Sequence, residues 1–244
     1  MTHWNSNTYG HWLLECLPKL FLLRTLRDHL PDLKIAISDA VSRDVTRWAS
    51  LLLPDVPLVV FEHQKEYLRC ARAILPGMLC DGSYFLHPAM NECISEIKTT
   101  TRAAGERRRI FIVRADEYSF RRLANKLEIM DIAAAHGLDL IQPETLSIAD
   151  QVKTFASASI IVGEFGSAMH NAMFADDVSV LCLGWISGIQ SRIAALRGQS
   201  IGYLLPPDRT TIKFQNDMPS KDYSIDPDEF AEALRRMLAM SGKR

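Results

Sequence analysis

The most informative segment of the chain reads Ile160-Ile161-Val162-Gly163-Glu164-Phe165-Gly166-Ser167-Ala168-Met169-His170-Asn171-Ala172-Met173-Phe174. Its first residues form an apolar run that predicts a strand over 160–162, and residues 167–174 predict a short helix. The glycines between them would leave backbone N–H groups pointing at whatever lies above the turn, which suits a phosphate group. The segment contains neither a Walker Gly-Lys-Ser/Thr nor a GxGxxG fingerprint. It therefore indicates either an anion site of another kind or a structural turn.

Strands and helices alternate around this segment. Apolar runs predict strands at 110–113, 138–141, 160–162 and 178–183, and amphipathic patterns predict helices at 121–136 and 148–156. The first of these helices carries Leu123, Leu127, Met130 and Ala134 on one side and stops at Gly137. The alternation predicts an α/β fold in which helices cover both faces of a parallel sheet.

A last helix follows, with Asp226 as its cap and Pro227 at its first position. Its apolar stripe comprises Phe230, Ala233, Leu234, Met237 and Leu238.

The N-terminal half is less regular. A helix is predicted from His11 to Leu30, capped by Asn7 or Thr8 and bent at Pro18, which cannot donate a backbone hydrogen bond. Strands are predicted at 33–37, 57–61 and 68–75, the second of them buried, and helices at 44–53 and 91–101. The polar segment 99–109 is the best boundary. We expect three parts, 1–104, 105–225 and the C-terminal helix 226–244.

Composition narrows the class of protein. The 244 residues carry 28 basic and 29 acidic side chains, so no basic excess drives sequence-independent nucleic-acid binding. The five cysteines are odd in number and include no CxxC pair, which disfavours a disulfide scaffold or a structural zinc site. No stretch reaches the ~20 apolar residues of a membrane span, and residues 1–15 lack the layout of a signal peptide. We therefore expect a cytoplasmic protein.

Ligands of parallel α/β sheets bind at the carboxyl ends of the strands. Arg114 follows the strand at 110–113, and Arg121 and Arg122 open the next helix; arginine forks match the oxygens of a diphosphate. Glu144 follows the strand at 138–141, where a carboxylate could accept hydrogen bonds from ribose hydroxyls. After the glycine turn, His170 could bind a phosphate oxygen. Each of these residues, taken alone, also fits a structural or solvated role.

His11 and Glu15 lie four residues apart on the predicted N-terminal helix, where an imidazole oriented by a carboxylate could act as a general base. Metal and nucleophile alternatives have little support. No HExxH or HxxxH spacing occurs, and no GxSxG elbow is present. The single Asp-x-Asp, at 226–228, is explained by the helix cap.

Taken in order, these motifs resemble glycosyltransferase family 61, which includes bacterial enzymes of capsular polysaccharide biosynthesis. The matching motifs are Asn7-x-x-x-His11-Trp12-Leu13-Leu14-Glu15-x-Leu17-Pro18-x-Leu20, Arg114, Arg121-Arg122-Leu123-Ala124-Asn125 with Glu128, Pro143-Glu144-Thr145-Leu146-Ser147 with Gln151, and the segment 161–174. The resemblance covers residues 5–185. Lys126 stands where the family commonly has glutamate. Glu164 and His170 stand where many members have histidine and threonine or serine, so donor preference is expected to differ.

The resemblance implies a GT-B-like fold, in which two Rossmann-like halves face each other across a cleft. The chain begins almost at the first motif, so its N-terminal half is expected to be naturally short or a fragment. The implied activity is inverting transfer of a hexosyl, pentosyl or N-acetylhexosaminyl group from a nucleotide sugar, often a UDP-sugar, to a hydroxyl of a glycan or polysaccharide acceptor. The resemblance implies no catalytic metal and no cofactor besides this co-substrate, and it leaves room for peripheral membrane association.

The resemblance also assigns roles to residues. His11 is the expected base with Glu15 as its partner, and the reverse assignment is nearly as well supported. The diphosphate would be held by Arg114, Arg122, Gly166, Ser167 and His170. Glu144 and Asn125 would contact the nucleoside, and Asn171 would bind the donor or fix the loop.

Two other functions remain open. A binding module without turnover would bind the nucleotide sugar while a partner supplies the acceptor site. An NAD- or SAM-dependent enzyme would need a glycine fingerprint directly after the first strand of its nucleotide domain, where this chain has Val113-Arg114-Ala115-Asp116.

Overall fold

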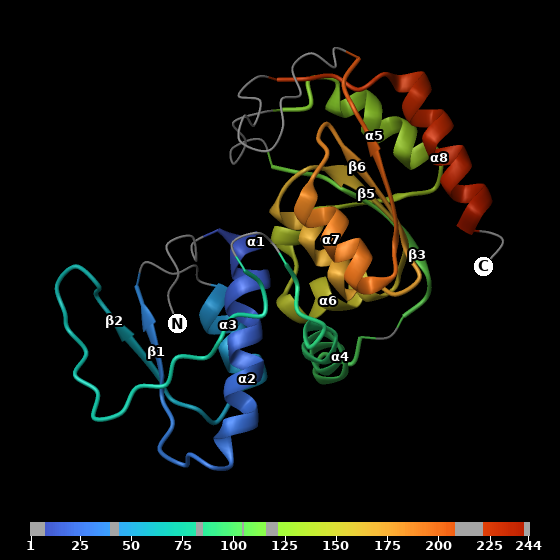
Figure 1. Cartoon of the computed structure of the whole chain (residues 1–244). Helices are drawn as coiled ribbons and strands as arrows, with labels where there is room; N and C mark the ends of the chain where they lie inside the picture. Colours follow the sequence, from blue (N-terminus) through green and yellow to red (C-terminus); the bar gives the residue numbers. More distant parts are fainter. Residues whose placement is uncertain are drawn as a thin grey trace. The chain divides into compact units, whose positions relative to one another are not determined.

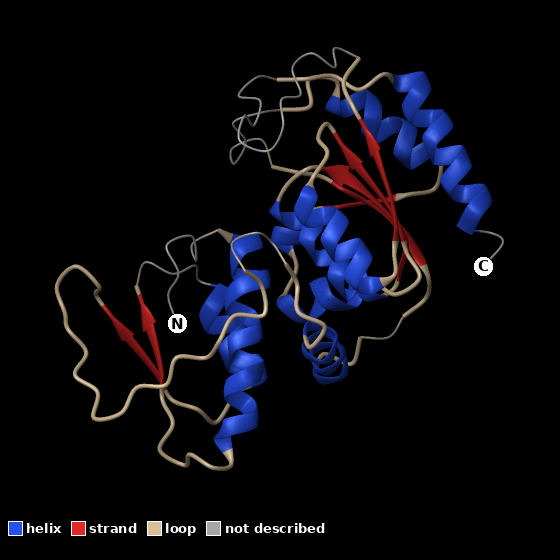
Figure 2. Ribbon diagram, in the orientation of Figure 1, coloured by secondary structure: helices blue, strands red, loops and turns tan. Residues whose placement is uncertain are grey.

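The computed structural model describes residues 8–39, 44–81, 85–103, 105–115, 122–207 and 222–241. The chain divides into two compact units, Met1–Thr100 and Thr101–Arg244. Figure 1 and Figure 2 show that each unit combines helices with a sheet of its own, and both sheets are parallel. The predicted α/β class with parallel strands is therefore confirmed.

The larger unit contains a five-stranded parallel sheet in the order β4-β3-β5-β6-β7. Its strands are β3 (Arg108–Ile112), β4 (Asp139–Ile141), β5 (Ala158–Glu164), β6 (Ser179–Leu183) and β7 (Ser200–Leu204). From β3 the chain moves outward to β4, then returns past β3 to β5 and continues in the other direction. The strand order thus reverses between β3 and β5, which is where doubly wound, Rossmann-like sheets bind ligands.

Helices cover both faces of this sheet (Figure 1). On one face, α5 (Lys126–Ala135) packs against α8 (Pro227–Ser241). On the other face lie α6 (Ile148–Ala156), the 3-10 helix η4 (Ser167–Phe174) and α7 (Gly188–Arg197). A short 3-10 turn, η3 (Pro143–Thr145), follows β4. Since both faces are covered, β5 and β6 are buried along their whole length.

The predicted ends of α6 and the predicted cap of α8 are confirmed. The Oδ1 atom of Asp226 accepts hydrogen bonds from the N–H groups of Asp228 and Glu229 at 2.9 and 3.0 Å. Behind this cap, Phe230 meets Phe111 of β3 edge to face, with ring centroids 6.3 Å apart. The predicted apolar stripe of α8 therefore packs on the sheet.

Four details of the larger unit differ from the sequence prediction. Helix α5 begins at Lys126 instead of residue 121, which lies outside the described residues. Leu127, expected on its apolar side, is 75% exposed, whereas Ile129 and Ala133 are buried. The predicted buried face of this helix was wrong because it was counted from Leu123. Leu123 is buried, but it precedes the helix and pairs with Tyr223 in a β-bridge. The segment 167–174 is a 3-10 helix, and α7 and β7 were not predicted.

In the smaller unit, α1 (Tyr9–His11), the π-helical turn η1 (Trp12–Cys16) and α2 (Leu17–Arg27) follow one another without a break. The N–H of Leu17 bonds to the carbonyl of Trp12, five residues back. This wider turn lies immediately before Pro18, which has no N–H. The irregularity that the sequence predicts at Pro18 is therefore a π-helical turn. Thr8 occupies the cap position without a side-chain cap bond.

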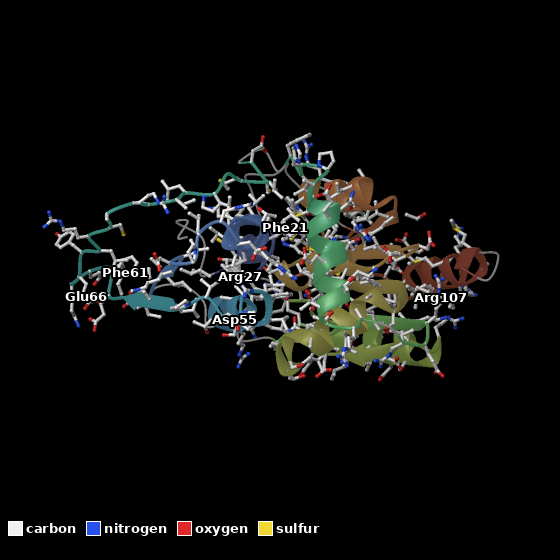
Figure 3. The ribbon with its side chains drawn as sticks, turned by 90° about the horizontal axis from the view of Figure 1, so that it is seen from below. Phe21, Arg27, Asp55, Phe61, Glu66 and Arg107 are labelled. Carbon is white, nitrogen blue, oxygen red and sulfur yellow. The ribbon has the colours of Figure 1, made fainter. Side chains whose placement is uncertain are left out.

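The other elements of the smaller unit are a parallel pair and two helices. They are β1 (Ile35–Ser38), α3 (Asp44–Leu52), β2 (Leu58–Phe61) and α4 (Met90–Thr100). Arg27 at the end of α2 forms an ion pair of 2.9 Å with Asp55, in the turn before β2 (Figure 3).

Two predictions for this unit were wrong. Strand β2 was expected to be buried, but Val60 is 57% exposed and the other residues of β2 are only partly buried. Residues 68–75 were expected to form a strand, but they are irregular, and Leu75 is 87% exposed. An apolar run becomes a strand only where a partner strand accepts its backbone bonds, and none pairs with 68–75 among the described residues. No helix in the described part of the chain is long and apolar enough to cross a membrane.

Candidate functional site

Chemically active side chains gather where the strand order reverses, at the carboxyl ends of β3 and β5. Arg114 follows β3, and its Nη1 donates a hydrogen bond to the carbonyl oxygen of Phe165, 3.1 Å away, just beyond β5. The guanidinium also lies against Gly166, because a Cβ atom there would come within 3.4 Å of Nη1 and 3.5 Å of Cζ. The structure thus brings Arg114 and the glycine turn together.

Glycine at 163 lets η4 approach the sheet. A Cβ atom on Gly163 would come within 2.9 Å of Sδ of Met169 and 3.0 Å of Cβ of Ile112. A side chain at this position would push η4 outward, and with it the residues that begin at Ser167.

Two buried amides hold η4 in place. Nε2 of Gln190 on α7 donates to the carbonyl of Met169 at 2.9 Å. Nδ2 of the fully buried Asn171 donates to the carbonyl of Ala168 at 3.1 Å. Of the two roles considered for Asn171, fixing the loop agrees with this contact.

The start of η4 offers hydrogen-bond donors. The N–H groups of Ser167 and Ala168 have no partner among the residues that the structure describes, as is usual in the first turn of a helix. Ser167 and His170 are half-buried on this helix. Because the guanidinium of Arg114 lies beside the same turn, a cation and backbone donors converge in a way that suits a phosphate oxygen.

A buried carboxyl group lies beneath this turn. Glu164, the last residue of β5, is 6% exposed, and burial raises the pKa of its carboxyl group. Nζ of Lys126 lies 3.9 Å from Oε1 of Glu164, and the hydroxyl of Tyr223 donates to Oε2 at 3.3 Å. These contacts and the charge of Arg114 partly oppose the effect of burial.

Lys126 connects this carboxyl group to the candidate anion site. Its Nζ also donates to the backbone carbonyl of Arg114 at 2.7 Å. The contact ties the start of α5 to the end of β3, from which the guanidinium projects. The sequence singled out Lys126 and Glu164 only as departures from the family pattern, and no sequence signal pointed to Tyr223.

The ring of Tyr223 is itself held by a glycine. Gly184, directly after β6, has a φ of +87°, and a Cβ atom there would lie 2.5 Å from Cζ of Tyr223. A residue with a side chain would therefore suffer backbone strain and a clash.

Other predicted site residues have structural contacts or lie on the surface. Both ends of the Asn125 amide bond the backbone of Ile225, at 2.8 and 3.2 Å, so this side chain fastens the segment before α8. Arg122 and Glu144 are exposed. Arg121 lies outside the described residues.

The predicted histidine–carboxylate pair forms in the smaller unit. Nδ1 of His11 lies 2.6 Å from Oε1 of Glu15, across the start of the π-turn. The side chain of Glu15 is 7% exposed and that of His11 is 25% exposed. The imidazole is therefore the more accessible of the two groups.

Metal-binding clusters and reactive thiols have less support in the structure than these two groups of residues. No cluster of three His, Cys, Asp or Glu residues able to hold a metal ion occurs in the described ranges. Four of the five cysteines are buried and Cys70 is exposed. Burial raises the pKa of Cys16 to about 11 and that of Cys93 to about 12, so these thiols stay protonated at neutral pH.

The chain was compared with known proteins. No curated protein gives a significant match to it. The model of the family described as Glycosyltransferase 61 matches residues 9–182, from the helix that carries His11 to the end of the β6 strand. Because this match spans more than half of the chain, the protein belongs to glycosyltransferase family 61 and is a glycosyltransferase.

Proposed function

We propose that this enzyme is an inverting, metal-independent glycosyltransferase that moves a sugar from a nucleotide sugar, first of all a UDP-sugar, to a hydroxyl of a glycan or polysaccharide acceptor. We place the reaction in the cytoplasm, within capsular or other polysaccharide biosynthesis. The proposed fold is GT-B, with the smaller unit on the acceptor side and the larger unit on the donor side. The observation that supports it best is the guanidinium of Arg114 over the glycine turn at 166, where the strand order reverses.

The donor diphosphate would bind at this turn. Arg114 supplies a cation, and the N–H groups of Ser167 and Ala168 supply donors to the phosphate oxygens. His170 lies on the same helix. Glu144, in the turn after β4, remains the residue proposed to contact the nucleoside of the donor. Arg122 is exposed, so it would contact a bound donor only from the protein surface.

The transfer step needs a base and a stabilised leaving group. His11, oriented by Glu15, would take the proton of the acceptor hydroxyl while its oxygen attacks the anomeric carbon. The bond from that carbon to the phosphate oxygen breaks, and the nucleoside diphosphate leaves with the bonding electrons. The greater exposure of His11 favours it over Glu15 as the base. Arg114 and the backbone donors would neutralise the charge that develops on the diphosphate, in place of a metal ion.

A thermal-shift and hydrolysis screen against nucleotide sugars, with and without EDTA, tests this proposal. A ligand at about 100 times its dissociation constant adds roughly 2.7 kcal/mol to the free energy of unfolding, which is visible as a rise in melting temperature. We expect one nucleotide sugar to raise the melting temperature and to be slowly hydrolysed, equally in EDTA. Loss of both effects in EDTA would contradict metal independence, and no response to any nucleotide sugar would contradict the donor site.

A further inference from the structure

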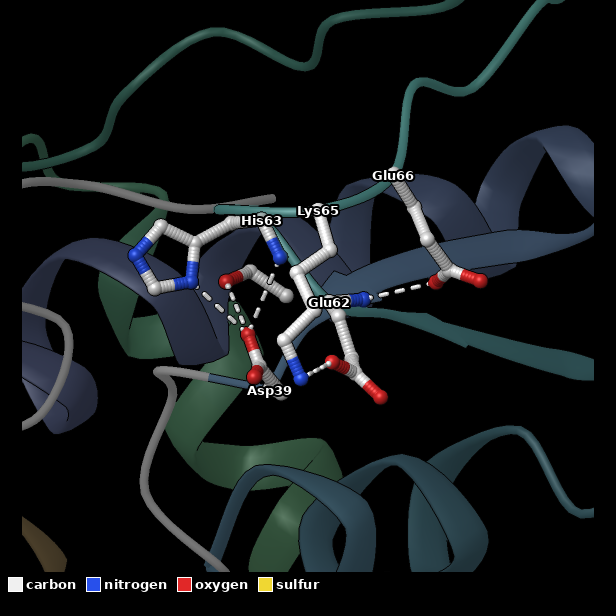
Figure 4. A network of polar contacts seen from close by, with 6 residues as sticks. Asp39, Glu62, His63, Lys65 and Glu66 are labelled. Atoms are coloured by element: carbon white, nitrogen blue, oxygen red, sulfur yellow. Dashed lines mark hydrogen bonds and ion pairs between the residues drawn. The ribbon is translucent and has the colours of Figure 1, made fainter.

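A second histidine–carboxylate pair lies at the carboxyl ends of β1 and β2 (Figure 4). Asp39 follows β1 and His63 follows β2. Oδ1 of Asp39 accepts hydrogen bonds from the backbone N–H of His63 at 3.1 Å and from its ring Nδ1 at 2.8 Å. The N–H of Asp39 bonds to the carbonyl of Phe61 at 3.0 Å. Both residues are therefore anchored to the strand pair.

This arrangement determines which ring nitrogen of His63 carries the proton. A carboxylate only accepts hydrogen bonds, so Nδ1 of His63 carries the proton and Nε2 presents its lone pair. The side-chain and backbone hydrogen bonds from His63 hold the pKa of Asp39 below its usual range, which keeps it an acceptor. The side chains of His63 and Asp39 are 44% and 45% exposed, and no described residue forms a hydrogen bond with Nε2. Figure 4 shows this nitrogen on the side of the ring away from Asp39.

The surrounding charges select the kind of ligand. Glu62 and Glu66 lie in the same turn as His63, and Lys65 pairs with Glu62 at 2.7 Å. Among the described residues of this turn and of Asp39, three carboxylates therefore stand beside one lysine, which pairs with Glu62. Such an edge repels a diphosphate and suits the uncharged hydroxyl groups of a sugar. The corresponding edge of the larger unit carries Arg114 and has the opposite preference.

The chain direction places this edge at the same end of the smaller unit as the first pair. Helix α2 leads away from His11, and β1 runs back toward the end of the unit where α1 lies (Figure 1). The carboxyl end of β1, with Asp39, is therefore at the same end of this unit as His11.

We propose that Asp39 and His63 form a binding site for a hydroxyl-bearing sugar, the glycan acceptor, in which Nε2 of His63 accepts a hydrogen bond from a sugar hydroxyl. This inference rests on the proposed function. His63 binds and positions the acceptor, whereas His11 takes the proton. Asp39 acts through His63 by holding its ring and its tautomer.

Initial rates test this site, with the donor found in the screen and p-nitrophenyl hexosides, pentosides and N-acetylhexosaminides as acceptors. His63→Ala should raise the acceptor KM about tenfold or more, and leave the donor KM and the hydrolysis of the donor by water unchanged. Asp39→Asn should act in the same direction. The control is His29→Ala, an exposed histidine in the turn after α2, which should change neither KM. An unchanged acceptor KM in His63→Ala would overturn the proposal.

Nuclear magnetic resonance of the imidazole nitrogens provides a test that needs no turnover. We expect His63 to be protonated on Nδ1 when neutral and Asp39→Asn to remove this preference, while His29 keeps the Nε2–H tautomer that a free histidine side chain prefers. Methyl glycosides of the same sugars should shift the His63 signals in the wild type and not in Asp39→Asn. If the wild type binds no nucleotide sugar but the His63 signals still shift, the donor-site proposal fails and the acceptor-site proposal stands. If no glycoside shifts the His63 signals more than the His29 signals, the acceptor-site proposal fails.

Discussion

The guanidinium of Arg114 packs directly on Gly166, across the two strand ends between which the strand order reverses. A Cβ atom at residue 166 would lie 3.4 Å from Nη1, at the short limit of ordinary van der Waals contact, so a methyl group there would touch the guanidinium. Gly166 itself has a φ of 171°, which is extended backbone that any residue adopts. The effect of a side chain at 166 would therefore come from contact with the guanidinium, and not from backbone strain.

Gly166→Ala should weaken donor binding with little effect on folding. The added methyl group would lie 3.4 Å from Nη1 of Arg114, at the short limit of van der Waals contact, and would cover part of the guanidinium where it faces the turn. We expect the dissociation constant of the donor to rise about tenfold, or ~1.4 kcal/mol. Isothermal calorimetry with the donor from the screen measures this. Gly77→Ala, where a Cβ atom meets nothing within 4 Å, is the control, and equal donor affinity in both variants would contradict the role of Arg114.

The titration of Glu164 should make stability depend on pH. Because burial raises its pKa above 4.5, the folded protein keeps this proton at pH values where the unfolded chain has lost it. The contribution of Glu164 to the free energy of unfolding therefore falls as pH rises above about 4.5. Glu164→Gln removes this titration, so the free energy of unfolding of the variant minus that of the wild type should grow more positive with rising pH.

Urea denaturation at a series of pH values measures this difference. Glu144→Gln, which changes an exposed carboxyl group of the same unit, is the control. A difference for Glu164→Gln that is constant with pH would show that the carboxyl group titrates alike in the folded and unfolded chains.

Gly184→Ala should destabilise the protein more than Gly198→Ala. Both glycines have positive φ, +87° and +64°, so both variants incur backbone strain of about 1 kcal/mol or more. Only at 184 would the new Cβ atom also collide with the ring of Tyr223, 2.5 Å away. We expect the difference between the two variants, measured by urea denaturation, to be about 2 kcal/mol. Equal losses would mean that the ring moves aside freely.

Asn125→Ala should reduce stability and spare donor binding. Its amide bonds both the N–H and the carbonyl of Ile225, so removal leaves these groups without their partner. The expected loss in free energy of unfolding is roughly 1–3 kcal/mol. A clear rise in the donor dissociation constant at a temperature where the variant is folded would instead support the nucleoside-binding role expected from the sequence.

Sequence patterns predicted the central strands β5 and β6 of the larger unit well because these strands are covered on both faces. Burial on both faces leaves a continuous apolar run, and β5 carries such a run from Ile160 to Val162. The strand expected at 68–75 failed for the complementary reason, because an apolar run does not indicate whether a partner strand exists. The wrong phase of α5 arose from Leu123, whose burial comes from its bridge to Tyr223 and not from the helix.

The candidate site was only partly predictable. The location of Arg114 and of the glycine turn followed from the rule that ligands bind at strand ends. The contacts that hold them join segments far apart in the chain, such as Lys126 with Glu164 and Asp39 with His63. No local periodicity encodes such pairings, and they became visible only with the strand order and register.

The pair of His11 and Glu15 should behave as one catalytic unit. His11→Ala should lower kcat by roughly 10²–10⁴-fold with little change in donor affinity, because the base acts on the acceptor proton and not on the donor. Glu15→Gln keeps the size of the side chain but removes the charge that orients the ring, so kcat should fall less. When two residues act together, the double variant loses little more than the worse single variant. Rates of the two single variants and of the double variant, with His29→Ala as control, decide this. Losses that multiply would show that the residues act separately, and full turnover by the double variant would remove both from the mechanism.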